Sequence, residues 1–140
     1  MSTRSVIGVH LNNVVYSIYC HFDGYPEGVG AILEQHYQSP EKRFGLVALG
    51  DLSCIDAELT PPIGAHHSYD RKHPGVVVAY HRDRGEELSP AEETDFATFI
   101  LNPPEHGQDY TYLHDGDNWL VKTHDGWERV AEVLKRRENE

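Results

Sequence analysis

The alternation of hydrophobic and polar positions near the start of the chain predicts a β-hairpin. Apolar and β-branched residues fill 5–11 and 14–22, and the Asn12-Asn13 pair between them tolerates the positive backbone angles of a tight turn. Successive side chains of a strand point to opposite faces, so we expect one set in the core: Val14, Tyr16, Ile18, Cys20 and Phe22. The other face becomes more polar toward its end: Val15, Ser17, Tyr19, His21 and Asp23. The second strand therefore delivers polar side chains to the turn that follows it.

Four later stretches carry the signals of helices. The apolar spacing over 29–37 is that of a helix lying against a sheet. The Ser39-Pro40 pair is a helix N-terminal signal, and we expect that second helix to stop at Gly50. A capping signature at 89–92 predicts a third helix, and a closing amphipathic helix is predicted over 127–134.

The rest of the chain supplies further strands and one long loop. The segment 51–75, rich in Pro, Gly and His, is predicted to be irregular, and a β-branched run at 76–80 to be a central strand. A second hairpin is predicted from 110–113 and 118–122. Together these elements predict an α+β fold, a single domain over 1–140 with one mixed, mainly antiparallel sheet of about five strands and helices packed on one face.

Charge narrows the choice of partner. The chain has 23 acidic against 12 basic residues, a formal net charge of −11. This balance disfavours direct binding to nucleic acid, because phosphate contacts need clustered Lys and Arg side chains. An acidic surface instead suits binding to a basic protein surface, with mimicry of DNA as one form of it. Composition therefore allows a protein partner without requiring one.

The same survey bears on location. The start of the chain lacks the apolar segment of a signal peptide, and no apolar run approaches the roughly 20 residues that span a bilayer. Cys20 and Cys54 are too few for a disulfide framework, and neither belongs to a CxxC pair. We therefore expect a cytoplasmic protein with reduced, buried thiols and no contact with membrane.

The densest cluster of chemically capable residues lies over 19–30, where the second strand runs into a helix through a glycine-rich turn. A helix N-terminus offers unpaired backbone N–H groups to an anion, and glycines allow a phosphate to approach closely. The candidate ligand-binding residues of this turn are Asp23, Gly24, Tyr25, Gly28 and Gly30. Their spacing fits neither the P-loop nor the dinucleotide fingerprint. The alternative is that the glycines only permit a sharp reversal of the chain.

A second charged cluster follows the predicted strand at 76–80. Arg82 and Arg84 would fork onto a phosphate or carboxylate, or would instead pair with neighbouring carboxylates at positions 83, 86 and 87. If both clusters lie at one end of the sheet, Tyr19 and His21 join them with stacking and hydrogen bonds. Such a site would suit a cyclic or adenine-bearing nucleotide.

Metal and nucleophilic chemistry are weaker alternatives. His21 and Asp23 form one His-x-Asp pair and His81 and Asp83 another, which resemble limbs of a metal site that a histidine at 66 or 67 would complete. Cys20 cannot pair with its neighbour His21, because adjacent strand residues face opposite sides of the sheet. We assign no catalytic residue, no metal ligand and no cofactor.

The aromatic residues near the end of the chain have two interpretations. Tyr110, Tyr112, Trp119 and Trp127 belong either to the core and sheet surface or to an exposed patch. An exposed patch would favour a protein partner or self-association into a homo-oligomer.

Several blocks of the sequence resemble a family of small proteins encoded by bacteriophages and prophages. These blocks are Thr3-Arg4-Ser5, Tyr19 to Gly28, His36-Tyr37 and Tyr80 to Glu86. Members usually have Gly and Trp where this chain has Ser2 and Phe22. The resemblance implies a phage accessory protein, a factor for host takeover or counter-defence, and implies no catalytic residues.

These observations lead to a ranked expectation. The first is a non-enzymatic phage accessory protein that binds a small anionic, nucleotide-like ligand between the 23–30 turn and the 82–86 segment. The second is an acidic inhibitor that binds a host or defence protein. The third is a small metal-dependent enzyme.

Overall fold

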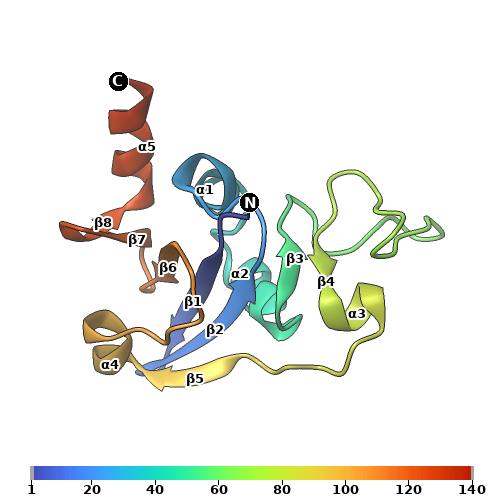
Figure 1. Ribbon diagram of the computed structural model, residues 1–140, viewed down its shortest axis with the longest axis horizontal. Coiled ribbons are helices and arrows are strands. Elements are labelled where there is room, and N and C mark those ends of the chain that lie inside the picture. Colours follow the sequence, from blue (N-terminus) through green and yellow to red (C-terminus); the bar gives the residue numbers. More distant parts are fainter. Residues whose placement is uncertain (1, 140) are drawn as a thin grey trace.

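The computed structural model describes residues 2–139 and has one mixed sheet of eight strands together with five α-helices (Figure 1). The strands are β1 Ser5–Leu11, β2 Val14–Cys20, β3 Leu52–Cys54, β4 Val78–Ala79, β5 Glu92–Asp95, β6 Tyr110–His114, β7 Trp119–Thr123 and β8 Gly126–Arg129. The helices are α1 Ala31–His36, α2 Pro40–Ala48, α3 Tyr80–Arg84, α4 Phe96–Leu101 and α5 Val130–Glu138, and a π-helical turn, Pro26–Gly30, precedes α1. The expected α+β class is confirmed.

The sheet has the order β4-β3-β2-β1-β6-β7-β8, and β5 pairs with β2 outside this path. The pairs β1–β6 and β2–β3 are parallel, and the other neighbours are antiparallel. It is larger than the expected sheet of about five strands. The additional strands β3, β5 and β8 are three or four residues long, too short for a period of two to stand out.

The first hairpin forms as its sequence predicts. Leu11 pairs with Val14, and Asn12 and Asn13 take φ values of 51° and 68° between them. Both central residues of a type I′ turn need positive φ, which Asn tolerates better than most side chains. The hairpin fixes which face of β2 each side chain occupies.

Side chains pack on both faces of the sheet, which corrects the expectation that helices cover only one. The larger core contains Ile7, Ile18 and Tyr112, against which α1, α2 and α5 pack. On the opposite face α4 inserts Phe99 between β1, β2 and β6, where it packs with buried Val15. The second face of β2 is therefore apolar at its start and polar only from Ser17 onward.

Two of the helix predictions differ from the structure at their ends. Ser39 caps α2 as expected, with its Oγ accepting the backbone N–H of Lys42. The capping signature at 89–92 instead leads into strand β5, and Asp95 caps α4 through the N–H of Thr98. Trp127 lies in β8, and the closing helix begins three residues later. In each case pairing with a neighbouring strand overrides a local helix signal.

Two further corrections concern the middle of the chain. The expected central strand at 76–80 is reduced to β4, which lies at the edge of the sheet and ends where the chain turns into the short helix α3 at Tyr80. The segment expected to be irregular over 51–75 contains β3, which pairs with the end of β2 at Cys20. No helix within residues 2–139 is long and apolar enough to cross a membrane.

Candidate functional site

The glycines of the 23–30 turn are in contact with the protein's own backbone. A Cβ on Gly24 would lie 2.9 Å from the carbonyl groups of Thr3 and Arg4, and one on Gly28 would overlap the carbonyl oxygen of Asp23. That oxygen already accepts the N–H of Val29 at 2.8 Å. These glycines are therefore needed because the protein's own backbone passes close to them, as expected if they only permit a sharp reversal of the chain.

The remaining residues of the turn also make local contacts. Gly30 is buried against the Tyr112 ring, whose hydroxyl donates to the carbonyl oxygen of Gly24 at 2.7 Å. Asp23 and Tyr25 are exposed, and the Tyr25 hydroxyl lies 3.5 Å from the Asp23 carboxylate. The turn is thus packed against the N-terminal segment and β6.

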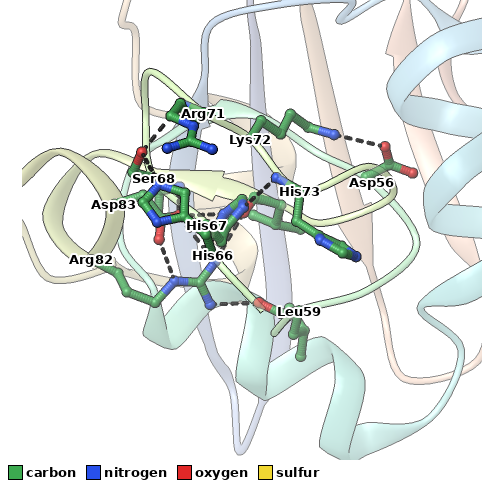
Figure 2. Close-up of polar contacts among 12 residues, drawn as sticks. Asp56, Leu59, His66, His67, Ser68, Arg71, Lys72, His73, Arg82 and Asp83 are labelled. Carbon is green, nitrogen blue, oxygen red and sulfur yellow. Dashed lines mark hydrogen bonds and ion pairs between the residues drawn. The ribbon is translucent and has the colours of Figure 1, made fainter. Parts of the chain in front are cut away.

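Arg82 has a structural role in α3, the short helix that follows β4 (Figure 2). Its guanidinium donates to the Asp83 carboxylate through Nε at 2.9 Å and Nη2 at 3.0 Å. The same group donates to the backbone carbonyls of Leu59 and Val77. Because four acceptors already surround this guanidinium, it holds the 59–77 segment onto α3 rather than facing a shared ligand space.

His67 completes this network below the surface (Figure 2). Its Nδ1 accepts the backbone N–H of His73 at 2.9 Å, so the ring carries its proton on Nε2. Nε2 lies 3.0 Å from the carbonyl oxygen of Val77 and 3.3 Å from Oδ2 of Asp83. Both ring nitrogens are committed to the fold, and this His–Asp pair has no free nitrogen to act as a general base.

Arg84 lies on the outside of α3. Its guanidinium is 4.6 Å from the centre of the Tyr69 ring and 5.9 Å from that of Tyr80, and it pairs with Glu86 at 3.2 Å. Because α3 is helical, Arg82 and Arg84 point in different directions and cannot fork onto one anion. The two arginines pair with the neighbouring carboxylates Asp83 and Glu86, as the alternative predicts, but only the Arg84–Glu86 pair lies on the surface.

Tyr19 and His21 are held together on the second face of the sheet. The Tyr19 hydroxyl lies 2.8 Å from Nδ1 of His21, and Nε2 of His21 lies 3.1 Å from Oγ of Ser2. Burial raises the pKa of the Tyr19 hydroxyl, and the nearby positive charge of Arg4 acts in the opposite direction. The sequence prediction that these two side chains share a face is confirmed.

Beside Tyr19 the second face is hollowed into a cavity of about 380 Å³. α4 covers this face near the first hairpin turn, and the cavity begins where that cover ends, at Val6 and Ser17. The residues that line it come from β1, β2, the position before β3, β5 with the segment that leads into it, and the loop before β6: Val6, Ser17, Ile18, Tyr19, Asp51, Ser89, Pro90, Glu92 and His106.

The cavity combines hydrogen-bond acceptors with one nearby cation. Asp51 accepts the backbone N–H of Tyr19 at 3.0 Å, and Glu92 pairs with His106 at 3.1 Å. Arg4 is exposed, and its Nη1 lies 3.7 Å from where a Cβ on Gly107 would be, next to His106. The site can therefore offer a guanidinium, hydroxyls and carboxylates to one small molecule.

Sequence reasoning found Tyr19 and missed most of the other lining residues. Asp51 lies in the segment interpreted as a loop, and Glu92 in the segment interpreted as a helix start. The one available signal was Arg4, which belongs to the Thr-Arg-Ser block. These residues are far apart in sequence, and the pairing of β2 with β3 and with β5 brings Asp51 and Glu92 to Tyr19.

The two His-x-Asp pairs are engaged elsewhere. Nδ1 of His81 lies 2.6 Å from the carbonyl oxygen of Glu86, and Asp83 accepts from Arg82 and the N–H of Ala79. Across residues 2–139 no three His, Cys, Asp or Glu side chains are grouped closely enough to hold a metal ion. Cys20 is buried, and burial raises its pKa to about 12.

The late aromatic residues belong mainly to the core. Trp119 and Tyr112 are fully buried, and Nε1 of Trp119 donates to the carbonyl oxygen of Tyr37. Tyr110 and Trp127 are half-buried against the two cores. The interpretation of these residues as core and sheet surface is confirmed.

No family model, no curated protein and no solved structure matches the chain.

Proposed function

We propose that the protein is a non-enzymatic binding protein for a small nucleotide-like ligand, held in the cavity beside Tyr19. The observation that carries the proposal is the closeness of Arg4 to Tyr19 and to Gly107, the neighbour of His106, because Tyr19 and His106 line a cavity that also holds hydroxyls and carboxylates. The proposed site keeps Tyr19, with His21 supporting its hydroxyl. In the proposed site Arg4 supplies the positive charge that the sequence prediction assigned to Arg82 and Arg84.

Arg4 is suited to an anionic group. Its backbone N–H bonds to Asp109, and within the described residues no carboxylate pairs with its guanidinium. A guanidinium offers a planar set of donors that matches a phosphate in a two-point contact. Arg4 therefore favours a ligand that carries a phosphate.

The carboxylates set the rest of the ligand's chemistry. Asp51 and Glu92 only accept hydrogen bonds when ionised, so they favour ribose hydroxyls and exocyclic amines. They also repel a highly charged phosphate chain, as does the net charge of −11. A cyclic or single-phosphate nucleotide fits this balance better than a triphosphate, and the cavity of about 380 Å³ lies in the usual range for small-molecule sites.

The role follows from the site and from the resemblance to phage-encoded proteins. The rings of His67 and His81 are engaged in backbone and carboxylate contacts, which supports binding without turnover. A phage accessory protein of this kind would act in the host cytoplasm and sequester a nucleotide signal of host defence.

A thermal-shift series on the purified protein tests the proposal, since a ligand that binds only the native state raises the melting temperature. We expect cyclic and single-phosphate nucleotides to raise it more than triphosphates, and more than nucleosides that lack phosphate. The variant Arg4→Ala should weaken binding by about tenfold or more, the scale of one charge-assisted contact. Arg129→Ala, which removes an exposed arginine of β8 at the far end of the sheet, should bind as the wild type does.

Two results would overturn the proposal. One is the absence of any shift with the whole nucleotide series. The other is equal affinity of the wild type and Arg4→Ala, provided both melt at the same temperature without ligand.

A further inference from the structure

A second concave surface lies on the opposite side of β5 from the cavity. It is an apolar groove of about 370 Å³ between α2 and β5, lined by Leu11, Tyr16, Phe44, Val47, Ala48, Leu88, Pro90, Ala91 and Glu93. Leu11 and Leu88 each expose 43% of their surface along it. Large apolar side chains that stay exposed side by side mark interaction surfaces.

The strand beside this groove has an unpaired edge. β5 pairs with β2 and with no other strand in the described chain (Figure 1). The N–H of Phe96 bonds to the carbonyl oxygen of Asn13, and in an antiparallel ladder the hydrogen-bonded pairs recur at every second residue. Thr94 and Glu92 therefore face β2, and the N–H and C=O of Glu93 point away from it.

The edge and the groove are adjacent. Glu93 lies opposite Tyr16 in the register, and both line the groove. A strand added along β5 would bond to the backbone of Glu93 and place alternate side chains over the groove. Backbone pairing and apolar burial would then act together on the same bound segment.

Charge identifies the kind of segment that fits. β5 carries Glu92, Glu93 and Asp95, all exposed, and Glu86 and Glu87 lie in the stretch that leads to it. Like charges directly opposite each other destabilise a strand pair, so a second copy of β5 is a poor partner. Basic side chains beside these carboxylates are favourable.

We propose that β5 and the apolar groove bind an extended segment of a partner protein that alternates basic and apolar side chains. The apolar residues enter the groove between α2 and Leu88, on the face of the sheet that carries Glu93, and the basic residues on the other face lie beside Glu92. This surface adjoins the cavity beside Tyr19, since Pro90 lines both, but the proposal does not depend on the ligand proposed there. At this surface the negative charge of the chain would contribute directly to binding a partner.

The test uses a short fluorescent peptide that alternates Lys and Val, titrated with the full-length protein. The informative variant is Leu88→Glu, and its matched control is Leu101→Glu, which changes a leucine on α4 that is 80% exposed. Each adds one negative charge. Attraction by charge alone would strengthen binding in both variants, whereas insertion into the groove predicts about tenfold weaker binding for Leu88→Glu only.

A second peptide with Pro at every Val position keeps the charge but removes half of the backbone donors, and we expect it not to bind. Equal binding by Leu88→Glu and Leu101→Glu, at equal melting temperatures, would overturn the proposal. So would equal binding of the Pro peptide. If sedimentation shows a wild-type dimer that Leu88→Glu dissociates, the groove is occupied by a second copy and the proposed partner is wrong.

Discussion

Arg82 and Asp83 are neighbours in the chain and form a two-point ion pair, with Nε to Oδ1 at 2.9 Å and Nη2 to Oδ2 at 3.0 Å. Only 4% of the Asp83 side chain is exposed. The same guanidinium donates to the carbonyls of Leu59 and Val77, so one side chain ties α3 to the segment before it. Arg82, which the sequence suggested as a ligand-binding residue, instead stabilises the fold.

We expect Arg82→Ala to destabilise the protein by about 2 to 4 kcal/mol, because it removes two hydrogen bonds from the buried Asp83 carboxylate and one each from the carbonyls of Leu59 and Val77. Arg84→Ala, the control, removes an exposed ion pair and should cost less than about 1 kcal/mol. Urea unfolding of the two variants gives both values. Equal losses would contradict the structural role of Arg82.

Acid should weaken the same network. Burial acts to raise the pKa of the Asp83 carboxyl, but the hydrogen bonds from Arg82 and Ala79 and the charge of Arg82 outweigh it and hold that pKa below its ordinary 3.8. A pKa that is lower in the folded state gives stability that is complete above the unfolded value and is lost as the pH falls through the folded one. Asp83→Asn should therefore be less stable than the wild type at neutral pH, and the difference should shrink below about pH 4. A difference that stays constant down to low pH would contradict this prediction.

His114 adds a second pH dependence in a different range. Burial, assisted by the charge of Arg43, lowers its pKa from 6.5 to about 4. Between these pH values His114 binds a proton in the unfolded chain but not in the folded protein, so stability falls as the pH drops from about 6.5 toward 4. His114→Asn keeps an acceptor for the N–H of Gly116 and should flatten the stability curve over this range. His124→Asn, at an exposed position, serves as the control and should retain the wild-type curve.

The 23–30 turn can be tested through its glycines. A methyl group on Gly28 would overlap the carbonyl oxygen of Asp23, and we expect Gly28→Ala to cost about 1 to 3 kcal/mol, as overpacking does. Gly45→Ala places its methyl against the end of the Leu59 side chain, which can move, and it adds a better helix former to α2. Gly45→Ala should therefore cost much less. Thermal unfolding compares them, and a tolerated Gly28→Ala would mean that the turn is open.

Thiol labelling checks the burial of Cys20. Burial raises the pKa of Cys20 to about 12, and the thiolate is the reactive form. We expect a thiol reagent at mildly alkaline pH to leave Cys20 unlabelled in the native protein and to label it after unfolding in urea. Cys54, which is half-buried, should react slowly and account for any native signal. Native labelling that persists in Cys54→Ser would show that Cys20 is accessible.

Local chemistry was sufficient wherever neighbouring residues alone decide the conformation. The Asn12-Asn13 turn, the Ser39 cap of α2 and the shared face of Tyr19 and His21 all follow from rules that act over a few residues. The α+β class follows in the same way, because the sequence contains both the hydrophobic spacing of strands and that of helices.

Long-range pairing decided the rest. The capping signature at 89–92 predicts a helix, yet residues 92–95 form a strand, because β2 offers them a ladder of backbone hydrogen bonds. That pairing creates both the cavity beside Tyr19 and the groove beside Leu88, on the two sides of β5. Likewise, nothing in the spacing of Arg82 shows that the carbonyls of Leu59 and Val77 surround it. The sequence alone determined which residue types were available, and the tertiary structure decided which of them remain free to bind, because a donor already satisfied within the fold has nothing left for a ligand.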